Sequence, residues 1–180
     1  AEQVFGAPQA TIGILGFRPA AEDHKRWQPL IDHLNARVPG YEFRAQVLGY
    51  GALESAIANK SVDFVLTNPG HYVLMTQRNG MSSPLATLVP VDHGQALSVF
   101  GGVIFTKADR NDIRQLDDLR QRTVAATSKG SLGGYQAQAM TLLGLGIRIP
   151  EHARLIETDM PHDRVVDVVL DGRADAGFVR

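Results

Sequence analysis

Short apolar segments alternate along this chain with segments of helical spacing, and this alternation constrains the fold more than any other feature of the sequence. Residues 11–15 and 63–67 combine β-branched and apolar residues, as buried strands do. Apolar residues of the segment 27–38 recur at the spacing of one helix face. A strand at 41–48 and a helix at 52–60 complete two strand–helix–strand units, which indicates an α/β fold with a parallel sheet.

The pattern starts again after a polar passage at residues 90–95, where we expect the chain to cross between two domains. The predicted first lobe spans residues 1–92 and the predicted second lobe 93–180. Pro29 lies in the predicted helix 27–38 and either delays the start of this helix or bends it.

The remaining predicted elements are a loose leader at 1–9 and the following strands and helices. The strands are at 85–89, 97–106, 123–126, 154–157 and 174–179. The helices are at 69–75, 117–120, 135–143 and 165–170, the last with Asp159 as a candidate cap.

The stretch from Thr127 to Tyr135, Thr-Ser-Lys-Gly-Ser-Leu-Gly-Gly-Tyr, joins a predicted strand to the first turn of a predicted helix. A helix start has backbone N–H groups without intrahelical partners and a partial positive charge. The glycines let a ligand approach the backbone, and Ser128 and Ser131 add hydroxyl donors. Two interpretations stay open: an anion or a carboxylate binds here, or Ser131 caps the helix and the glycines turn the chain.

A second junction of this kind follows the strand at 63–67. Asn68 is a good N-cap, and Pro69 is a good first residue of a helix. A second helix start is therefore predicted at the carboxyl end of a parallel strand. In open α/β sheets, ligands bind at that edge.

The composition is that of a globular protein and excludes several classes. Apolar residues make up 44% of the chain and charged residues 21%, unlike a disordered chain. A net charge of -1 gives no electrostatic reason to expect binding to nucleic acid or to an anionic membrane. The absence of cysteine excludes disulfides, thiolate zinc sites and a cysteine nucleophile. No apolar run is long enough to span a bilayer.

The motifs of common enzyme classes are missing, so we expect no enzyme, no catalytic residues and no cofactor. The histidines show no His-Glu-x-x-His or other close ligand spacing, so we expect no metal site. Residues 130–133 lack the Gly-x-Ser-x-Gly frame of a nucleophile elbow. Neither a P-loop nor a Gly-x-Gly-x-x-Gly fingerprint occurs.

An ordered set of short motifs resembles the phosphonate-type periplasmic substrate-binding proteins. The motifs are Gly49-Tyr50, 53–57, 63–65 and 69–72 for the first lobe, and 102–107, 116–119, 124–135, His162-Asp163 and 172–177 for the second. Together they cover most of residues 10–180 in the order of that family. The resemblance implies a type II periplasmic binding fold, with two α/β lobes, each a mostly parallel sheet flanked by helices, and a ligand cleft between the lobes.

By position, the resemblance implies ligand contacts at the ends of predicted strands. These are Phe17, Arg18, Tyr50, Asn68, His71 and Tyr72 in the first lobe, and Ser128, Ser131, Gly133, Gly134, Tyr135 and His162 in the second. A guanidinium such as that of Arg18 suits a carboxylate or a phosphate, although a loop arginine is usually solvated. Each histidine and tyrosine also has an alternative role. In these alternatives His71 lies on a helix surface and His162 at a helix start, and Tyr50 and Tyr135 are packing aromatics.

The chain begins at Ala1 rather than Met and stops at Arg180, directly after a predicted strand. We therefore expect a trimmed piece that lacks the C-terminal return to the first lobe. The segment 66–72 resembles binding domains fused to membrane-bound sensor kinases or diguanylate cyclases. The resemblance implies a periplasmic sensor domain at a bacterial inner membrane, with a small oxyanion or carboxylate as ligand and an attached signalling domain as partner. The alternative is the solute-binding component of a phosphonate-type ABC transporter, with a permease as partner.

Overall fold

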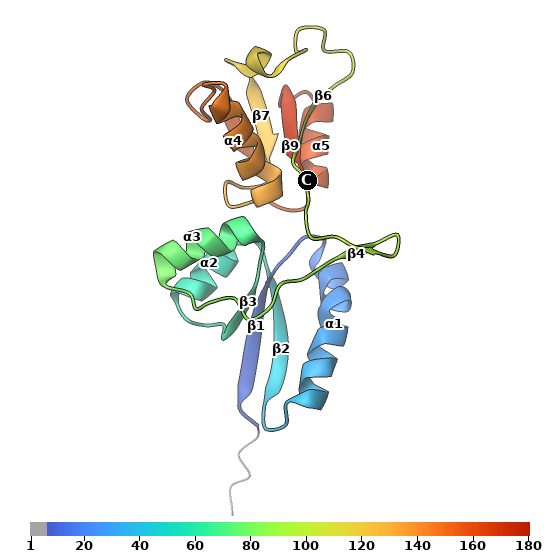
Figure 1. Ribbon diagram of the computed structural model, residues 1–180, viewed down its shortest axis with the longest axis vertical. Coiled ribbons are helices and arrows are strands. Elements are labelled where there is room, and N and C mark those ends of the chain that lie inside the picture. The colour runs from blue at the N-terminus through green and yellow to red at the C-terminus, as the bar shows by residue number, and fades with distance from the viewer. Residues whose placement is uncertain (1–6) are drawn as a thin grey trace, which may run out of the picture. The chain divides into compact units, whose positions relative to one another are not determined.

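The computed structural model describes residues 7–180, and the part of the predicted leader at residues 1–6 lies outside the described residues. The chain separates into two compact units, Ala1–Asn68 and Pro69–Arg180, and each unit has a sheet of its own (Figure 1). The predicted lobe boundary between residues 92 and 93 is a different division, and it stays a prediction.

The first unit is built on a three-stranded parallel sheet in the order β2-β1-β3. Its strands are β1 (Gln9–Leu15), β2 (Glu42–Leu48) and β3 (Phe64–Leu66), and helices α1 (Ala20–Arg37) and α2 (Tyr50–Ala58) connect them. The predicted strand–helix–strand units are confirmed. Because all strands run the same way, their carboxyl ends lie at one edge of the sheet.

The core of the first unit includes the inner face of α1. Trp27 and Ile31 of this helix belong to the same buried cluster as Ile14 of β1. On β1, Gly13 permits close packing of α2, because an added Cβ atom would lie 2.9 Å from Cδ1 of Leu53. The apolar periodicity of 27–38 is therefore the face that holds α1 on the sheet.

The second unit is built on a four-stranded sheet in the order β6-β9-β7-β8. Its strands are β6 (Val103–Thr106), β7 (Thr123–Ala126), β8 (Arg154–Glu157) and β9 (Ala176–Val179). Strand β7 runs parallel to both β8 and β9, whereas β6 pairs with β9 in the antiparallel sense.

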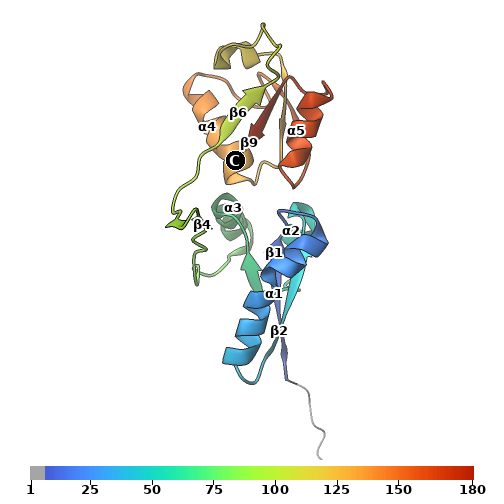
Figure 2. The same cartoon turned by 90° about the vertical axis from the view of Figure 1, so that its right-hand side faces the viewer.

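Two helices cover opposite faces of this sheet, α4 (Ala137–Gly144) and α5 (Asp163–Leu170), as Figures 1 and 2 show. Along β7, Val124 belongs to the buried cluster that contains Leu142 of α4. The next residue, Ala125, belongs to the cluster that contains Val165 of α5. This alternation is the period of a strand that is buried on both faces.

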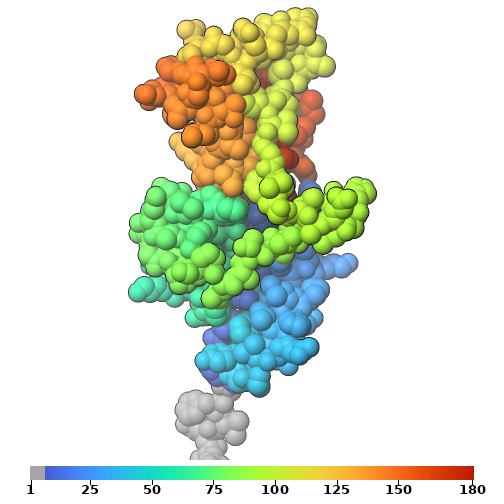
Figure 3. All heavy atoms as spheres, viewed as in Figure 1, coloured from blue at the N-terminus to red at the C-terminus, as the bar shows by residue number. Residues whose placement is uncertain are grey.

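The rest of the second unit consists of α3 (Pro69–Asn79), a hairpin of β4 (Val91–Asp92) and β5 (Gln95–Ala96), and the 3-10 helix η1 (Leu116–Leu119). The stretch that joins α3 to β6 lies at the surface, where Figure 3 shows it in yellow-green. The strand predicted at 85–89 is wrong, since no strand forms there. The strand predicted at 97–106 is confined to β6.

One alternative and one expectation about helix starts are excluded. Helix α1 begins at Ala20 and contains Pro29, so the delayed start is excluded for this proline and the bend stays a prediction. Asp159 is not the cap of α5, because His162 occupies that position and Asp159 adopts a φ of 60°. The helix predicted from residue 135 begins earlier, in the π-helical turn η2 (Leu132–Gln136), which continues directly into α4.

Candidate functional site

The residues that follow β7 and β8 lie at the same edge of the second unit's sheet, because these neighbouring strands are parallel. Backbone hydrogen bonds extend the pairing past the strand ends. The N–H of Thr158 donates to Ala126 O at 2.9 Å, and the N–H of Asp159 donates to Thr127 O at 2.8 Å. The Gly-rich loop and the segment that leads to His162 are thereby held next to each other.

Ser131 caps the helical segment that starts at Leu132. Its Oγ accepts a hydrogen bond from the N–H of Gly134 at 3.0 Å, and its carbonyl accepts from the N–H of Gln136 at 2.9 Å. One turn earlier, Ser128 Oγ accepts from the N–H of Gly130 at 3.1 Å. The capping interpretation of Ser131 is therefore confirmed, and the ligand interpretation of the same residue stays a prediction.

Gly134 is the point at which predicted site residues from both loops meet. A Cβ atom added there would lie 2.8 Å from Ser131 Oγ and 2.9 Å from Cε1 of His162, and it would also clash with Thr127 Oγ1. Two hydroxyl groups and an imidazole thus surround one glycine at the start of a helix. The geometry brings together hydrogen-bonding groups that are typical of an oxyanion site.

Thr127 was not among the predicted ligand contacts. Its side chain is fully buried, and its Oγ1 has no hydrogen-bond partner among the described residues. Leaving a buried hydroxyl unpaired costs free energy, so such a group is a candidate for pairing with a ligand. The available signal was a polar residue placed directly after the buried apolar run of β7.

The side chain of Tyr135, another predicted contact of this loop, has partners of its own. The hydroxyl of Tyr135 donates to Ile149 O at 3.3 Å, and its ring lies 6.5 Å from the ring of Phe178. Burial, with the nearby carboxylate of Glu157 as a smaller cause, raises the pKa of this phenol. These contacts support the packing alternative for Tyr135.

Gly133 faces a different set of neighbours from Gly134. A Cβ atom added at Gly133 would lie 2.8 Å from Cε2 of Phe100 and 2.9 Å from Cγ of Arg180. Its lack of a side chain therefore allows η2 to pack closely against the entry to β6 and the exit from β9. The structure does not bring Gly133 into the cluster of hydroxyls around Gly134.

The predicted residues of α3 occupy the start of that helix. His71 is fully buried, and Tyr72 is partly buried with its hydroxyl donating to Ser82 O at 3.0 Å. Gly70 lies against the side chain of Gln136, so the start of α3 packs on the turn η2. These contacts indicate that the start of α3 has a packing role, with its backbone against η2 and near the cluster around Gly134.

In the first unit, the predicted residues follow the carboxyl ends of the parallel strands. Phe17 and Arg18 lie between β1 and α1, and their backbone N–H groups donate to the buried carboxylate of Asp23 at 2.7 and 2.8 Å. Asn68 Nδ2 donates to the hydroxyl of Tyr50 at 2.9 Å. The structure thus pairs Tyr50 with Asn68, and it reveals Asp23, which the sequence prediction missed.

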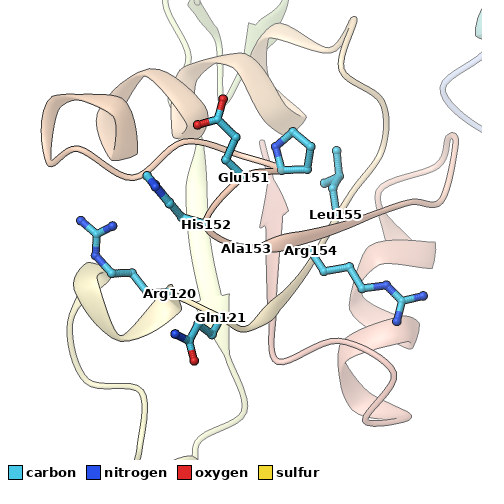
Figure 4. A pocket seen from close by; sticks show the side chains of 8 residues that line it. Arg120, Gln121, Glu151, His152, Ala153, Arg154 and Leu155 are labelled. Carbon is cyan, nitrogen blue, oxygen red and sulfur yellow. The ribbon is translucent and has the colours of Figure 1, made fainter.

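A surface hollow lies elsewhere on the second unit, near the amino ends of β7 and β8 (Figure 4). Its lining residues are Arg120, Gln121, Pro150, Glu151, His152, Ala153, Arg154 and Leu155. The guanidinium groups of Arg120 and Arg154 point away from each other in this view. Arg120 is also paired with Asp117, at 2.8 Å. The hollow therefore does not gather positive charge on one ligand position.

Within residues 7–180, no group of three or more histidine or acidic side chains is placed to hold a metal ion. Over the same residues, no helix combines the length and the apolar character needed to cross a membrane.

Residues 12–180 match the protein family described as "ABC transporter, phosphonate, periplasmic substrate-binding protein". The chain is 32% identical over 169 residues to the tetrathionate sensor histidine kinase TtrS of Salmonella typhimurium. That alignment covers 93% of this chain and 28% of TtrS, so the chain spans less than a third of this relative.

Solved structures of other proteins have a fold similar to that of this chain. PhnD1 from Prochlorococcus marinus in complex with methylphosphonate gives a TM-score of 0.72 at 17% identity, over 97% of this chain and 64% of that chain. XAC2383 from Xanthomonas citri bound to ATP gives a TM-score of 0.71 at 22% identity, over 95% of this chain and 63% of that chain. The predicted α/β fold of type II periplasmic binding proteins is confirmed.

Proposed function

Because this chain belongs to the family of phosphonate-type periplasmic substrate-binding proteins, we propose that it binds a small oxyanion at the carboxyl edge of the second unit's sheet. The observation that carries this proposal is the cluster of Thr127, Ser131 and His162 around Gly134. The family consists of substrate-binding proteins, so the proposed activity is binding without turnover.

The chemistry of the cluster favours an anion over a cation. Hydroxyl groups, an imidazole and the N–H groups of a helix start all donate hydrogen bonds to oxyanions. The partial positive charge of the helix start adds attraction in a chain whose net charge is only -1. Because Thr127 is fully buried, its hydroxyl reaches a ligand when the adjacent glycine segment shifts, which glycine backbone permits.

Two relatives support an oxyanion as the ligand class. The name of TtrS gives tetrathionate as what that protein senses, and PhnD1 was solved with methylphosphonate. Both compounds present negatively charged oxygens on a tetrahedral sulfur or phosphorus atom. We propose that this chain recognises the same kind of group through the residues around Gly134, with Ser128 as a further contact.

We propose a sensor role for the whole protein, in which ligand binding biases an attached membrane signalling domain. The identity to TtrS supports this role. A transport role is the second candidate, supported by the fold shared with the binding component of an ABC phosphonate transporter from Pseudomonas aeruginosa. The reading frame after Arg180 separates them: a transmembrane segment and a kinase support the sensor, whereas an early stop codon supports the transporter.

A thermal-shift screen tests the binding site. We expect at least one of tetrathionate, methylphosphonate, phosphate, an alkanesulfonate or acetate to raise the melting temperature, because a ligand that binds only the folded state stabilises it. Ser131→Ala and Thr127→Val should each reduce that ligand-induced rise. Ser131→Ala also lowers the starting melting temperature, since losing a cap costs roughly 1 kcal/mol, so the ligand-induced difference is the quantity to compare.

Ser83→Ala is the matched control, because Ser83 is exposed in the same unit and lies outside the proposed site. It should respond to the ligand as the unaltered chain does. An unchanged ligand response in both Ser131→Ala and Thr127→Val contradicts the proposed position of the site. No response of the unaltered chain to any compound of the panel contradicts the ligand class.

A further inference from the structure

Gln138 is a buried glutamine in the first turn of α4. Its Nε2 donates to Gly133 O at 2.7 Å, to Val179 O at 2.9 Å and to Val103 O at 3.3 Å. Because carbonyl oxygens only accept hydrogen bonds, the nitrogen end of the carboxamide must face them. Val103 begins β6, Val179 ends β9, and the two residues are register partners. Gln138 therefore fastens the turn η2 to the sheet.

The oxygen end of the same carboxamide is in a less favourable position. Its Oε1 is buried and has no hydrogen-bond partner among the described residues. An unpaired buried oxygen costs free energy. Gly102 leaves the room for this carboxamide, because a Cβ atom added there would lie 2.5 Å from Nε2 and 2.6 Å from Cδ of Gln138. The fold thus keeps a polar group here at a cost, which indicates a task besides packing.

The carbonyl of Gly133 and the N–H of Gly134 belong to one peptide group, and both ends of this group are hydrogen-bonded. The carbonyl accepts from Gln138, and the N–H donates to Ser131 Oγ at 3.0 Å. The Ser131 hydroxyl is the acceptor in this contact, which leaves its own hydrogen for donation. Hydrogen bonds in such a chain polarise one another, so a donor to Gly133 O strengthens the donors that follow. The direction of donation runs from Gln138 to Ser131.

The same arrangement occurs a second time in this loop. Gln136 Nε2 donates to Lys129 O at 3.0 Å, and the N–H of the next residue, Gly130, donates to Ser128 Oγ at 3.1 Å. Each of the two serines therefore accepts from a peptide group whose carbonyl is held by a glutamine. The bond of Gln136 lies at the surface and that of Gln138 is buried, so we expect the larger effect from Gln138.

We propose that Gln138 is a positioning residue for oxyanion binding, which acts by holding the Gly133–Gly134 peptide group so that the Ser131 hydroxyl donates to the ligand. Gln136 acts in the same way on Ser128. This inference rests on the proposed function, in which both serines contact the ligand. All of these residues belong to the second unit. An anion that accepts from the hydroxyl strengthens the whole chain of donors behind it.

NMR of the uniformly ¹⁵N-labelled 180-residue chain tests this inference without any substitution. During titration with methylphosphonate and with tetrathionate, the side-chain amide signals of Gln138 should shift. They should saturate at the same ligand concentration as the backbone amide signal of Gly134. The side-chain signals of Gln77, an exposed residue of α3, are the control and should stay in place. Saturation at Gly134 with unmoved signals of Gln138 overturns the inference.

Isothermal titration calorimetry with the same two compounds tests which serine each glutamine serves. Gln138→Met keeps the length of the side chain and removes its donor, so it should weaken binding roughly three- to tenfold, the size of one lost hydrogen bond. In a Ser131→Ala background, Gln138→Met should change the affinity less than about twofold. In a Ser128→Ala background, its full effect should persist. Gln136→Met should show the reverse dependence on the two serines.

Gln77→Met is the matched control and should leave the affinity unchanged. Equal losses from Gln138→Met in both serine backgrounds, or a lower melting temperature at unchanged affinity, would mean that Gln138 is merely structural. That result overturns this inference, while a reduced ligand response in Ser131→Ala still supports the proposed function. If Gln138→Met fails to fold, the NMR titration of the unaltered chain decides. No binding of either compound to the unaltered chain overturns both the inference and the proposed function.

Discussion

At the scale of single residues, the missing side chain of Gly134 is what allows Thr127, Ser131 and His162 to meet. The capping role of Ser131 was accessible to sequence analysis, because a serine before a helical segment satisfies local N–H groups. The importance of Thr127 and Asp23 was not accessible to sequence analysis. Both depend on complete burial, which results from packing between segments far apart in the chain.

Gly134→Ala should destabilise the protein by roughly 1–3 kcal/mol, the usual cost of forcing a methyl group into a filled site. The added methyl would approach Ser131 Oγ to 2.8 Å and Cε1 of His162 to 2.9 Å. Urea denaturation measures the change. Gly144→Ala is the control, because no atom lies within 4 Å of its added Cβ and alanine favours the helix. Equal stability of the two variants would contradict the close packing at Gly134.

At the scale of elements, strands were predicted well where they have partners and poorly where they do not. The apolar run of β7 is buried between β8 and β9, and its prediction is confirmed. The segment 85–89 has the same apolar character, but no strand of the described residues pairs with it. A strand requires hydrogen bonds to a neighbour, and the sequence of one segment does not reveal whether that neighbour exists.

Asp175 ties three segments of the second unit together at the start of β9. Its Oδ2 accepts from the N–H of Thr123 at 2.8 Å, and its Oδ1 pairs with Arg110 at 2.7 Å. Burial by itself would raise the pKa of Asp175, but the Thr123 amide and the Arg110 guanidinium outweigh it and hold the pKa below its usual value. The same arginine lowers the pKa of Asp112.

These lowered pKa values predict that the free energy of unfolding depends on pH. The folded state binds fewer protons than the unfolded state, so the stabilisation is present above the unfolded pKa, about 3.9, and is lost as the pH falls through the folded pKa. Asp175→Asn should therefore destabilise the protein near neutral pH, and this difference should shrink below about pH 4. Urea denaturation across this range measures it. A difference independent of pH would contradict the account.

At the scale of the whole molecule, the fold class and the family were accessible from the order of the motifs, and both are confirmed. The compact units divide after Asn68, whereas the lobe boundary expected in the polar passage at 90–95 stays a prediction. Compactness depends on which segments pack together, and a turn-like composition marks only where the chain bends. The binding cleft between lobes stays a prediction of the resemblance.

The central claim is that the helix start after β7 binds an oxyanion, and NMR of the uniformly ¹⁵N-labelled chain tests it most directly. During titration with tetrathionate or methylphosphonate, the backbone amide signals of Ser128, Ser131, Gly134 and His162 should shift progressively and saturate, more than those of any other described segment of the second unit. Saturable shifts confined to the hollow around Arg120 and Arg154, with the signal of Gly134 unchanged, would contradict the claim.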